Sequence, residues 1–435
     1  MSGLRFAMIT TFYPPYHFGG DAVFIRRLVG ALARRGHAVD VIHDVDAFEL
    51  LHRGPTPAPL EEPDGVRVFP LRSRLGALSC LATQQLGRPL VHGARIRRLL
   101  AAGRPDVIHF HNVSLVGGPG ILDLGEGIKL YTAHEHWLVC PSHVLWRHNR
   151  ELCTGRQCLR CQLHFRRPPQ LWRRTDLLER KAGQIDAFLS PSAFSARKHR
   201  EFGFPRDLEV MPYFLPDLDS DSEAERGRAA DVTGRPYFLF VGRLEKIKGL
   251  QDAIPLFGAD VPADLCVVGT GGYEAELRAQ AAGLERVRFL GSRTPEELRL
   301  LYRNALAVLV PSICYETFGI TLLEAFRERT PVVARALGPL TELVRESGGG
   351  LLFSTAPELR AALVRLTADG ELREKLGRDG HAALRARWTE SAVLPSYFAL
   401  IRRIAERRGD RRLVAALEAD SAGGSGDGGR ASCER

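Results

Sequence analysis

The chain of 435 residues contains no run of apolar residues long enough to cross a bilayer as a helix. Its first segment, MSGLRFAMITTFYPP, also lacks the long apolar stretch of a signal peptide and is typical of a strand followed by a turn. We therefore expect a cytoplasmic protein. The net charge of +9 is moderate, so it allows contact with anionic lipid or acidic glycan and does not require nucleic acid.

Several familiar catalytic patterns are also missing. The chain shows no Ser-His-Asp order, no Walker-type Gly-Lys-Ser/Thr segment and, within residues 236–388, no Asp-x-Asp motif that would hold a metal beside a nucleotide. No carboxylate stands out as a nucleophile. Any diphosphate bound by this chain is therefore expected to be neutralised by side-chain cations and helix N-termini in place of a catalytic metal.

Two carboxylates dominate what is present. Glu316 and Glu324 are separated by seven residues and follow an apolar run, 305–312, that is typical of a buried parallel strand. Gly319 permits close backbone approach, and a helix that begins near it offers free N–H groups to an anion. Glu324 lies about one turn into that helix, where it can reach a hydroxyl beside the anion. Phosphate and hydroxyl recognition together suggest a nucleotide-sugar; the alternative is an amphipathic helix with two solvated glutamates.

A second segment has the same character. The apolar run Tyr237 to Val241 predicts a strand that ends in Gly242-Arg243, and Lys248-Gly249 follows. A glycine turn at a strand end with cations beyond it suits a diphosphate, since Arg243 can donate two parallel N–H bonds and Lys248 can act as a point charge. The alternative is a polar loop with exposed bases.

Strands and helices are predicted to alternate in two separate stretches of the chain. The segment 5–11 predicts a strand leading to a glycine loop, 21–35 predicts a helix, and the alternation restarts at Tyr237. We therefore predict an α/β protein of two doubly wound, Rossmann-like domains that face a cleft. The predicted parts are an amino-terminal, acceptor-side domain (1–216), a polar linker (217–235), a carboxy-terminal domain (236–388) and a disordered glycine- and serine-rich tail (420–435).

Four of the eight cysteines lie close together in the sequence as C-x12-C-x4-C-x2-C, within a Cys-rich insert at about 140–180. They are Cys140, Cys153, Cys158 and Cys161. The last two form a tight pair, and the first two could close a tetrahedral site of four sulfur ligands, so we predict a structural zinc site. The alternatives are a Cys₃His site using His143, His148 or His164, an iron–sulfur cluster, or four reduced thiols without metal.

The same insert carries much of the positive charge. Near Leu171 and Trp172 lie six arginines: Arg156, Arg160, Arg166, Arg167, Arg173 and Arg174. Such a mixture could rest on a membrane surface, which would place the protein peripherally at the inner membrane face. A solvated, arginine-rich face is the alternative.

Taken in order, several stretches make the sequence resemble the family 4 retaining glycosyltransferases, which have the two-domain architecture called GT-B. The resemblance covers most of residues 5–405. The matching stretches are ITTFYPPYHFGGD (9–21), DVIHFHN (106–112), YTAHEHW (131–137), FVGRLEKIKG (240–249), VVGTGG (267–272), VRFLG (287–291), VPSICYETFGITLLEA (310–325), TPVVA (330–334) and GPLTELV (338–344).

The resemblance implies roles for residues in the carboxyl half. Arg243 and Lys248 resemble the pair that neutralises the donor diphosphate. Glu324 resembles the residue that binds the ribose hydroxyls, and Glu316 the carboxylate that contacts the transferred sugar. The backbone expected to meet phosphate and sugar belongs to Phe318, Gly319, Ile320, Thr321 and Leu322.

Other implied roles concern the amino-terminal half. Gly19 and Gly20 resemble the glycine loop below the diphosphate. His134 resembles the histidine that contacts the donor sugar, with His136 as the alternate. The family's final helix usually crosses back to the first domain, and residues 389–410 stand where that helix is expected.

We therefore expect a sugar transferase with an NDP-sugar donor and a glycan, lipid-linked or small-molecule acceptor, acting with retention of anomeric configuration and requiring no cofactor for catalysis. A GT-B phosphorylase or a nucleotide-sugar epimerase is the enzymatic alternative. A zinc-containing nucleic-acid-binding module is the alternative of another class. The two-carboxylate segment has no use in such a module, so no nucleic acid partner is expected.

Overall fold

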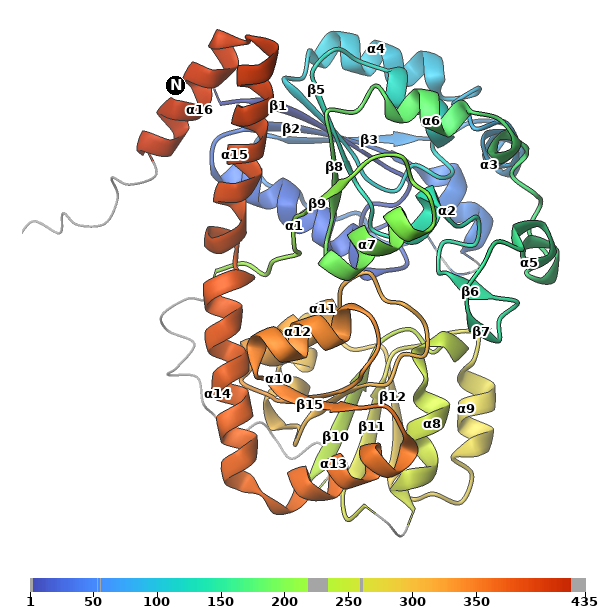
Figure 1. Cartoon of the computed structure of the whole chain (residues 1–435), viewed down its shortest axis with the longest axis vertical. Helices are drawn as coiled ribbons and strands as arrows, with labels where there is room; N and C mark the ends of the chain where they lie inside the picture. The colour runs from blue at the N-terminus through green and yellow to red at the C-terminus, as the bar shows by residue number, and fades with distance from the viewer. Residues whose placement is uncertain (1–2, 53, 55, 218–233, 259–260, 424–435) are drawn as a thin grey trace, which may run out of the picture.

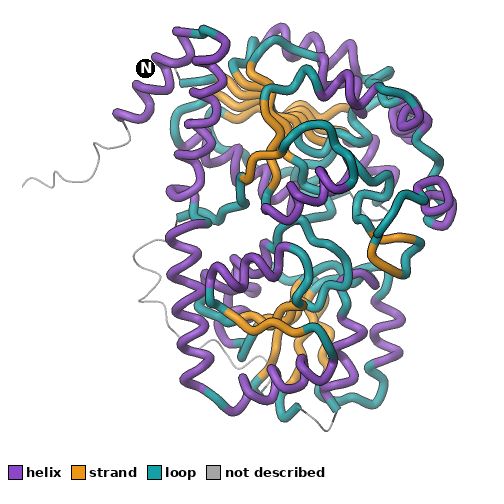
Figure 2. Tube along the Cα trace, in the orientation of Figure 1, coloured by secondary structure: helices purple, strands orange, loops and turns teal. Residues whose placement is uncertain are grey.

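The computed structural model contains two α/β domains, each built on a parallel sheet (Figures 1 and 2). The structure describes residues 3–52, 54, 56–217, 234–258 and 261–423. The prediction of two Rossmann-like domains is confirmed. Most of the predicted linker and residues 424–435 of the predicted tail lie outside the described residues, whereas 420–423 belong to the end of a helix.

The first domain contains a seven-stranded sheet in the order β3-β2-β1-β4-β5-β8-β9, with every neighbouring pair parallel. Its strands are β1 (Arg5–Thr10), β2 (Ala38–Asp44), β3 (Val66–Leu71), β4 (Val107–Phe110), β5 (Ile128–Thr132), β8 (Ala187–Ser190) and β9 (Leu208–Val210). Its helices are α1 (Gly20–Arg34), α2 (Val45–Leu51), α3 (Ala77–Leu86), α4 (Gly93–Gly103), α5 (Cys158–His164), α6 (Leu177–Ala182) and α7 (Ala193–Glu201). Every residue of β4 and β5 is buried, as expected for central strands covered on both faces.

The second domain contains a six-stranded parallel sheet in the order β12-β11-β10-β13-β14-β15. Its strands are β10 (Tyr237–Val241), β11 (Asp264–Val268), β12 (Val287–Gly291), β13 (Val308–Val310), β14 (Val332–Arg335) and β15 (Gly350–Phe353). Its helices are α8 (Leu250–Ala253), α9 (Glu274–Gln280), α10 (Pro295–Asn304), α11 (Ile320–Arg327), α12 (Pro339–Ser347) and α13 (Ala356–Ala368). Helix α10 begins with a complete capping box between Thr294 and Glu297, which satisfies two backbone N–H groups at its N-terminus.

Three helices end the described chain and join the domains: α14 (Gly370–Arg387), α15 (Glu390–Arg408) and α16 (Arg411–Gly423). Figure 1 shows α14 beside the second domain and α15 and α16 beside the first. The hydroxyl of Tyr397 in α15 lies 3.0 Å from His109 Nδ1 in β4, and the Glu390 carboxylate binds Arg34 and Arg35 at the end of α1. The last helices therefore pack on the first domain.

The carboxyl ends of both sheets meet at the junction between the domains. The Thr317 hydroxyl, in the loop after β13, donates a 2.8 Å hydrogen bond to the carbonyl of His134, just after β5. The Ser192 hydroxyl, at the start of α7, donates a 2.7 Å bond to the Thr317 carbonyl. These contacts place loops from both domains around the Glu316–Glu324 segment, at the strand ends where doubly wound domains bind ligands.

Candidate functional site

Lys248 and Glu316 form the charged centre of the site. Lys248 Nζ lies 2.7 Å from Glu316 Oε1, and the Ser312 hydroxyl donates a second 2.7 Å hydrogen bond to the same oxygen. The side chains of Lys248 and Glu316 are 23% and 22% exposed, so a ligand can still reach both. The structure thus brings together two segments that the sequence predicts separately as phosphate-binding.

A glycine makes this meeting possible. Gly249 has φ +73°, and a Cβ atom there would lie 1.9 Å from the carbonyl oxygen of Pro311. The turn η5 (Lys246–Lys248) can therefore rest directly on the end of β13. The backbone N–H of Ile313 donates to the Ile247 carbonyl at 2.9 Å and fixes the contact. Any other residue at 249 would push Lys248 away from Glu316.

Both members of this pair are held in their charged forms. Burial opposes ionisation of each group, but the opposite charge of the partner outweighs it. The pKa of Lys248 is therefore raised, and the pKa of Glu316 is lowered, with Ser312 contributing a hydrogen bond to the carboxylate. A fixed cation and a fixed carboxylate side by side suit a ligand that carries both phosphate and hydroxyl groups.

The start of α11 supplies a second anion-binding element. Gly319 has φ 144° and ψ 59°, and a Cβ there would lie 3.0 Å from Leu340. The next residues form the first turn of the helix, whose leading N–H groups have no partner within the helix. A Cβ on Gly20 would lie 3.4 Å from Ile320, so the amino-terminal glycine loop does face α11. Gly19 is the N-cap of α1.

The carboxylate of Glu324, in the second domain, also contacts the first domain. Its carboxylate accepts a 3.1 Å bond from Arg27 Nη2 in α1 and a 3.0 Å bond from the Tyr302 hydroxyl in α10. The Glu324 side chain is 28% exposed. Burial and then the neighbouring Glu324 raise the pKa of Tyr302 well above its ordinary value, so this tyrosine stays a donor.

The other predicted site residues differ from one another in exposure and in contacts. Arg243 is half exposed and donates a 2.7 Å bond to Glu245. Phe318 is buried and packs against the Tyr213 ring at 5.1 Å. Leu322 is fully buried. His136, the alternate to His134, is buried against the His199 ring at 5.4 Å.

The backbone of His134 contacts the Glu316–Glu324 segment. Its carbonyl binds Thr317, as described above, while the residue as a whole is 6% exposed. Ring Nδ1 lies 2.6 Å from the Tyr213 hydroxyl, and Nε2 lies 2.8 Å from His111 Nδ1. Both ring nitrogens therefore already have partners inside the first domain, and the catalytic role of His134 stays a prediction.

Several buried histidines, including His134, lead us to predict that the fold loses stability in mild acid. Burial lowers the pKa of His109 to about 3, and that of His134 and His199 to about 4; His111 and His136 lie well below their usual value. These rings stay neutral when folded but gain a proton in the unfolded chain near pH 6.5. Each therefore contributes stability above pH 6.5 that is lost as the pH falls toward 4, up to about 2 kcal/mol per ring at pH 5.

Urea unfolding at pH 7.5, 6.5, 5.8 and 5.0 measures this loss. We expect the midpoint to be constant above pH 7 and to fall steadily below 6.5. Asp44 opposes the trend, because burial raises its pKa to about 7 and the folded state then binds the extra proton. One carboxyl does not offset five rings, so an unchanged midpoint at pH 5.0 would contradict the buried, neutral histidines.

One group of side chains has the spacing of a cation site. Among the described residues, Asp44, Asp46 and His92 bring ligand atoms within 4.8 Å of one another. Their hydrogen bonds are internal: Asp44 caps α2 through Ala47 N–H at 3.1 Å, and His92 Nε2 lies 3.1 Å from Asp46. We interpret the group as a buried polar network that joins the end of β2 to α2 and α4.

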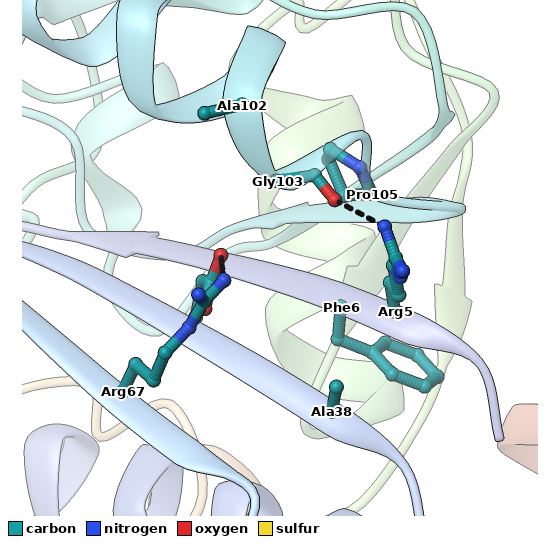
Figure 3. A pocket seen from close by; sticks show the side chains of 8 residues that line it. Arg5, Phe6, Ala38, Arg67, Ala102, Gly103 and Pro105 are labelled. Atoms are coloured by element: carbon teal, nitrogen blue, oxygen red, sulfur yellow. Dashed lines mark hydrogen bonds and ion pairs between the residues drawn. The ribbon is translucent and has the colours of Figure 1, made fainter.

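A cavity of about 270 Å³ lies elsewhere, between Arg5, Ala38, Arg67 and Gly103 (Figure 3). The cavity lies where β1 and β2 begin, whereas Lys248, Glu316 and Glu324 follow the carboxyl ends of strands. Arg67 is already paired with Asp40 at 2.7 Å. This cavity is therefore separate from the candidate site.

Sequence reasoning missed several polar residues of the site. Ser312, Tyr302, Arg27 and Tyr213 contact predicted residues, but each is distant in sequence or lies on an ordinary helix face. Only Ser312 carried a local signal, because it lies four residues before Glu316 at the end of the predicted strand.

Comparison with known proteins gives consistent matches over both domains. Residues 18–215 match the model of Glycosyltransferase Family 4, and residues 221–382 match that of Glycosyl transferases group 1. A D-inositol 3-phosphate glycosyltransferase from Corynebacterium jeikeium is 36% identical over 425 residues, which cover 89% of this chain and 94% of that protein.

Solved structures share the fold at low identity. Sucrose-phosphate synthase from Thermosynechococcus elongatus superposes with a TM-score of 0.70 at 22% identity, covering 93% of this chain and 100% of the other. HepE from Anabaena, solved in complex with UDP-glucose, gives a TM-score of 0.61 at 19% identity, covering 94% of this chain and 100% of the other.

Proposed function

Because the chain belongs to the GT-B glycosyltransferases of the family 4 type, we propose that it transfers a sugar from an NDP-sugar to an acceptor with retention of anomeric configuration. The observation that carries this proposal is the Lys248–Glu316 pair at 2.7 Å beside the N-terminus of α11. It combines a cation, a carboxylate and helix N–H groups in one place, which are the groups that a sugar diphosphate requires.

In this proposal the donor diphosphate lies against Lys248, Arg243 and the first turn of α11. Cleavage of the sugar–phosphate bond leaves growing negative charge on the diphosphate, and fixed positive groups act most strongly where that charge develops. Glu324 binds the ribose hydroxyls. UDP-glucose bound to HepE, which has the same fold, supports a nucleotide-sugar donor for this chain.

We propose that the anomeric configuration is retained because the acceptor attacks the anomeric carbon on the same face from which the leaving group departs. The acceptor oxygen forms a bond to the anomeric carbon as the carbon–oxygen bond to phosphate breaks, and the acceptor proton passes to a phosphate oxygen. Glu316 is a poor nucleophile because Lys248 and Ser312 already bind its Oε1. We infer that it positions a sugar hydroxyl.

The acceptor is proposed to be a glycan, a lipid-linked glycan or a small molecule. The similarity to the D-inositol 3-phosphate glycosyltransferase of C. jeikeium supports a small polyol phosphate as the first acceptor to test. A thermal-shift screen of UDP-, GDP- and ADP-sugars should identify the donor, because ligand at 100 times its dissociation constant stabilises the fold by about 2.7 kcal/mol. Stabilisation by none of them would contradict the proposed function.

A surface of exposed leucines supports peripheral membrane contact. We call it the leucine surface, and it consists of Leu50, Leu51, Leu78, Leu81, Leu86, Leu159, Leu163 and Leu171. All of these except Leu171 lie on α2, α3 and α5, which Figure 1 shows on one side of the first domain, and Gln85 of α3 binds the Pro169 carbonyl at 2.9 Å. Residues 65–105 carry eight arginines and no Asp or Glu, which suits an anionic bilayer.

Two members of the expected membrane-facing mixture turn inward. Trp172 is buried, and the Arg173 guanidinium lies over its ring at 4.4 Å. The prediction that grouped Trp172 and Arg173 with the exposed residues is wrong, because an aromatic ring and a cation pack together as readily as they face lipid. Among the described residues, no helix has the length and apolar character needed to span a membrane.

Charge reversal on the leucine surface should weaken membrane binding. We expect Leu78→Asp combined with Leu163→Asp to reduce association with phosphatidylglycerol vesicles at least about 10-fold, since two apolar anchors are lost and two like charges are added. Leu300→Asp, on α10 of the second domain and 40% exposed, is the control. Co-sedimentation at low and high salt measures the effect. If the native chain does not sediment at low salt, membrane contact is refuted.

A further inference from the structure

The segment 147–169 has almost no hydrophobic core. Of these residues, all of which the structure describes, only Cys161 and Gln162 are buried. The segment contains the short helix α5 and all but the first residue of a hairpin. The two strands of the hairpin, β6 (Trp146–Arg147) and β7 (Glu151–Leu152), have two residues each. A hairpin of this size is not stable alone in water. Apart from Leu145 and Trp146, which are buried, this small unit has few apolar side chains to stabilise it, so a crosslink would add stability.

The four clustered cysteines occupy the points that a crosslink would have to join. Cys140 lies before the hairpin, and Cys153 lies directly after it, where its N–H donates to the Leu145 carbonyl at 2.8 Å. Cys158 and Cys161 lie in the first turn of α5. A tight turn, in which Arg150 N–H donates to the Arg147 carbonyl at 3.0 Å, brings these parts back together.

The helix that carries Cys158 and Cys161 contacts the hairpin: Cys161 Sγ lies 3.9 Å from the carbonyl oxygen of Trp146 in β6. All four side chains are free thiols. Three of the remaining cysteines lie apart from them: Cys80, Cys266 and Cys314 are buried in the two domains.

Polar groups that stabilise metal-bound sulfur surround the cluster. The backbone N–H of His148 donates to Cys161 Sγ at 3.4 Å, and Ser142 Oγ lies 3.2 Å from Cys140 Sγ. Bonds of this kind orient and stabilise metal-bound thiolates. Arg156 and Arg173 line a cavity of about 320 Å³ together with Cys158. The bonds found for Arg173 go to Gln170 and to backbone carbonyls of Trp137 and Leu138, so its charge is available to a nearby anionic cluster.

We propose that Cys140, Cys153, Cys158 and Cys161 bind one tetrahedral, thiophilic divalent metal ion of the Zn²⁺ type, which crosslinks the segment 140–161. The four thiols lose four protons on binding, and the product, one Zn²⁺ with four thiolates, carries two negative charges beside Arg156 and Arg173. Sulfurs in such a site lie about 3.8 Å apart. Among the described residues no three of these sulfurs lie within 4.8 Å of one another, so binding requires the four side chains to turn toward a common point.

The crosslink is connected to the donor site through Arg173. This side chain binds the carbonyls of Trp137 and Leu138, which follow His134 by only a few residues. Loss of the metal should therefore loosen the His134 loop and reduce transfer, while loss of transfer alone should leave the metal bound. Metal content tests this inference independently of the proposed function.

The test measures metal in the full chain purified without chelators. We expect about one zinc per chain by elemental analysis, and at least about a five-fold lower content in Cys158→Ser and in Cys161→Ser. Cys80→Ala is the matched control and should keep its metal. Replacement of zinc by Co²⁺ should give the intense sulfur-to-metal absorption of a four-thiolate site in the native chain.

A second measurement uses only the native chain, so it is informative even if the serine variants do not fold. In the native chain, modification of the thiols with a mercurial should release zinc to a chromophoric chelator in proportion to the sulfurs blocked. Four outcomes overturn the inference: no metal in chain purified under reducing conditions, iron with acid-labile sulfide in place of zinc, disulfides among the four cysteines, or full zinc content in both serine variants.

Discussion

Lys248→Ala is expected to lower kcat/KM for sugar transfer by about 1,000-fold, or about 4 kcal/mol of transition-state stabilisation. Lys248 is charged, partly exposed and 2.7 Å from Glu316, so its ammonium group is fixed where the departing diphosphate gains charge. The variant should unfold within a few degrees of the native chain. Initial rates with the donor identified by thermal shift, together with a melting curve, measure both quantities.

A double-mutant cycle separates a functional pair from a merely structural one. If Lys248 and Glu316 served only each other, Lys248→Ala combined with Glu316→Ala would recover much of the activity lost in either single variant. Under the proposal each contacts the donor, so the double variant stays inactive. Lys375→Ala, which removes an exposed lysine paired with Asp379 on α14, is the control and should keep native rates. Near-native activity of Lys248→Ala would refute the assignment.

Glu324→Ala should raise the dissociation constant of the donor nucleotide about 100-fold. A carboxylate that accepts two ribose hydroxyls contributes about 1.5–3 kcal/mol per bond, part of which water recovers. The Tyr302 hydroxyl and Arg27 hold this carboxylate from opposite domains at 3.0 and 3.1 Å. Calorimetric titration with the nucleoside diphosphate measures the change.

The same geometry allows a different explanation, in which Glu324 only clamps the domains together through Arg27. Arg27→Ala breaks the bridge and leaves the carboxylate in place. If Glu324 binds ribose, Arg27→Ala should weaken nucleotide binding by no more than about five-fold, since a partly exposed ion pair contributes about 1 kcal/mol or less. Equal losses in both variants would instead assign Glu324 to domain closure.

The sequence is sufficient for those parts of the site that lie within one segment. Glu316, Gly319 and Glu324 follow a recognisable strand and begin a recognisable helix, so their relative placement follows from local geometry. The same holds for Lys248 and Gly249 after β10. The two-domain fold was predictable because alternating strand and helix periodicity occurs twice.

Contacts across the chain could not be predicted in this way. Lys248 and Glu316 are 68 residues apart, and Arg27 and Glu324 are 297 apart, so their pairing depends on strand order and on how the domains meet. The buried partners of the His134 ring depend on the same packing. The inward turn of Trp172 and Arg173 likewise reflects tertiary contacts that composition does not reveal.

The central claim is that the second domain holds a sugar nucleotide by its diphosphate, between Lys248 and the start of α11. Isothermal titration of the native chain and of Lys248→Ala with UDP, GDP and ADP tests it most directly. We predict one binding site per native chain for one of these nucleotides, and binding at least about 100-fold weaker in the variant. Equal affinity in both proteins, or no heat from any of the three with the folded native chain, would contradict the claim.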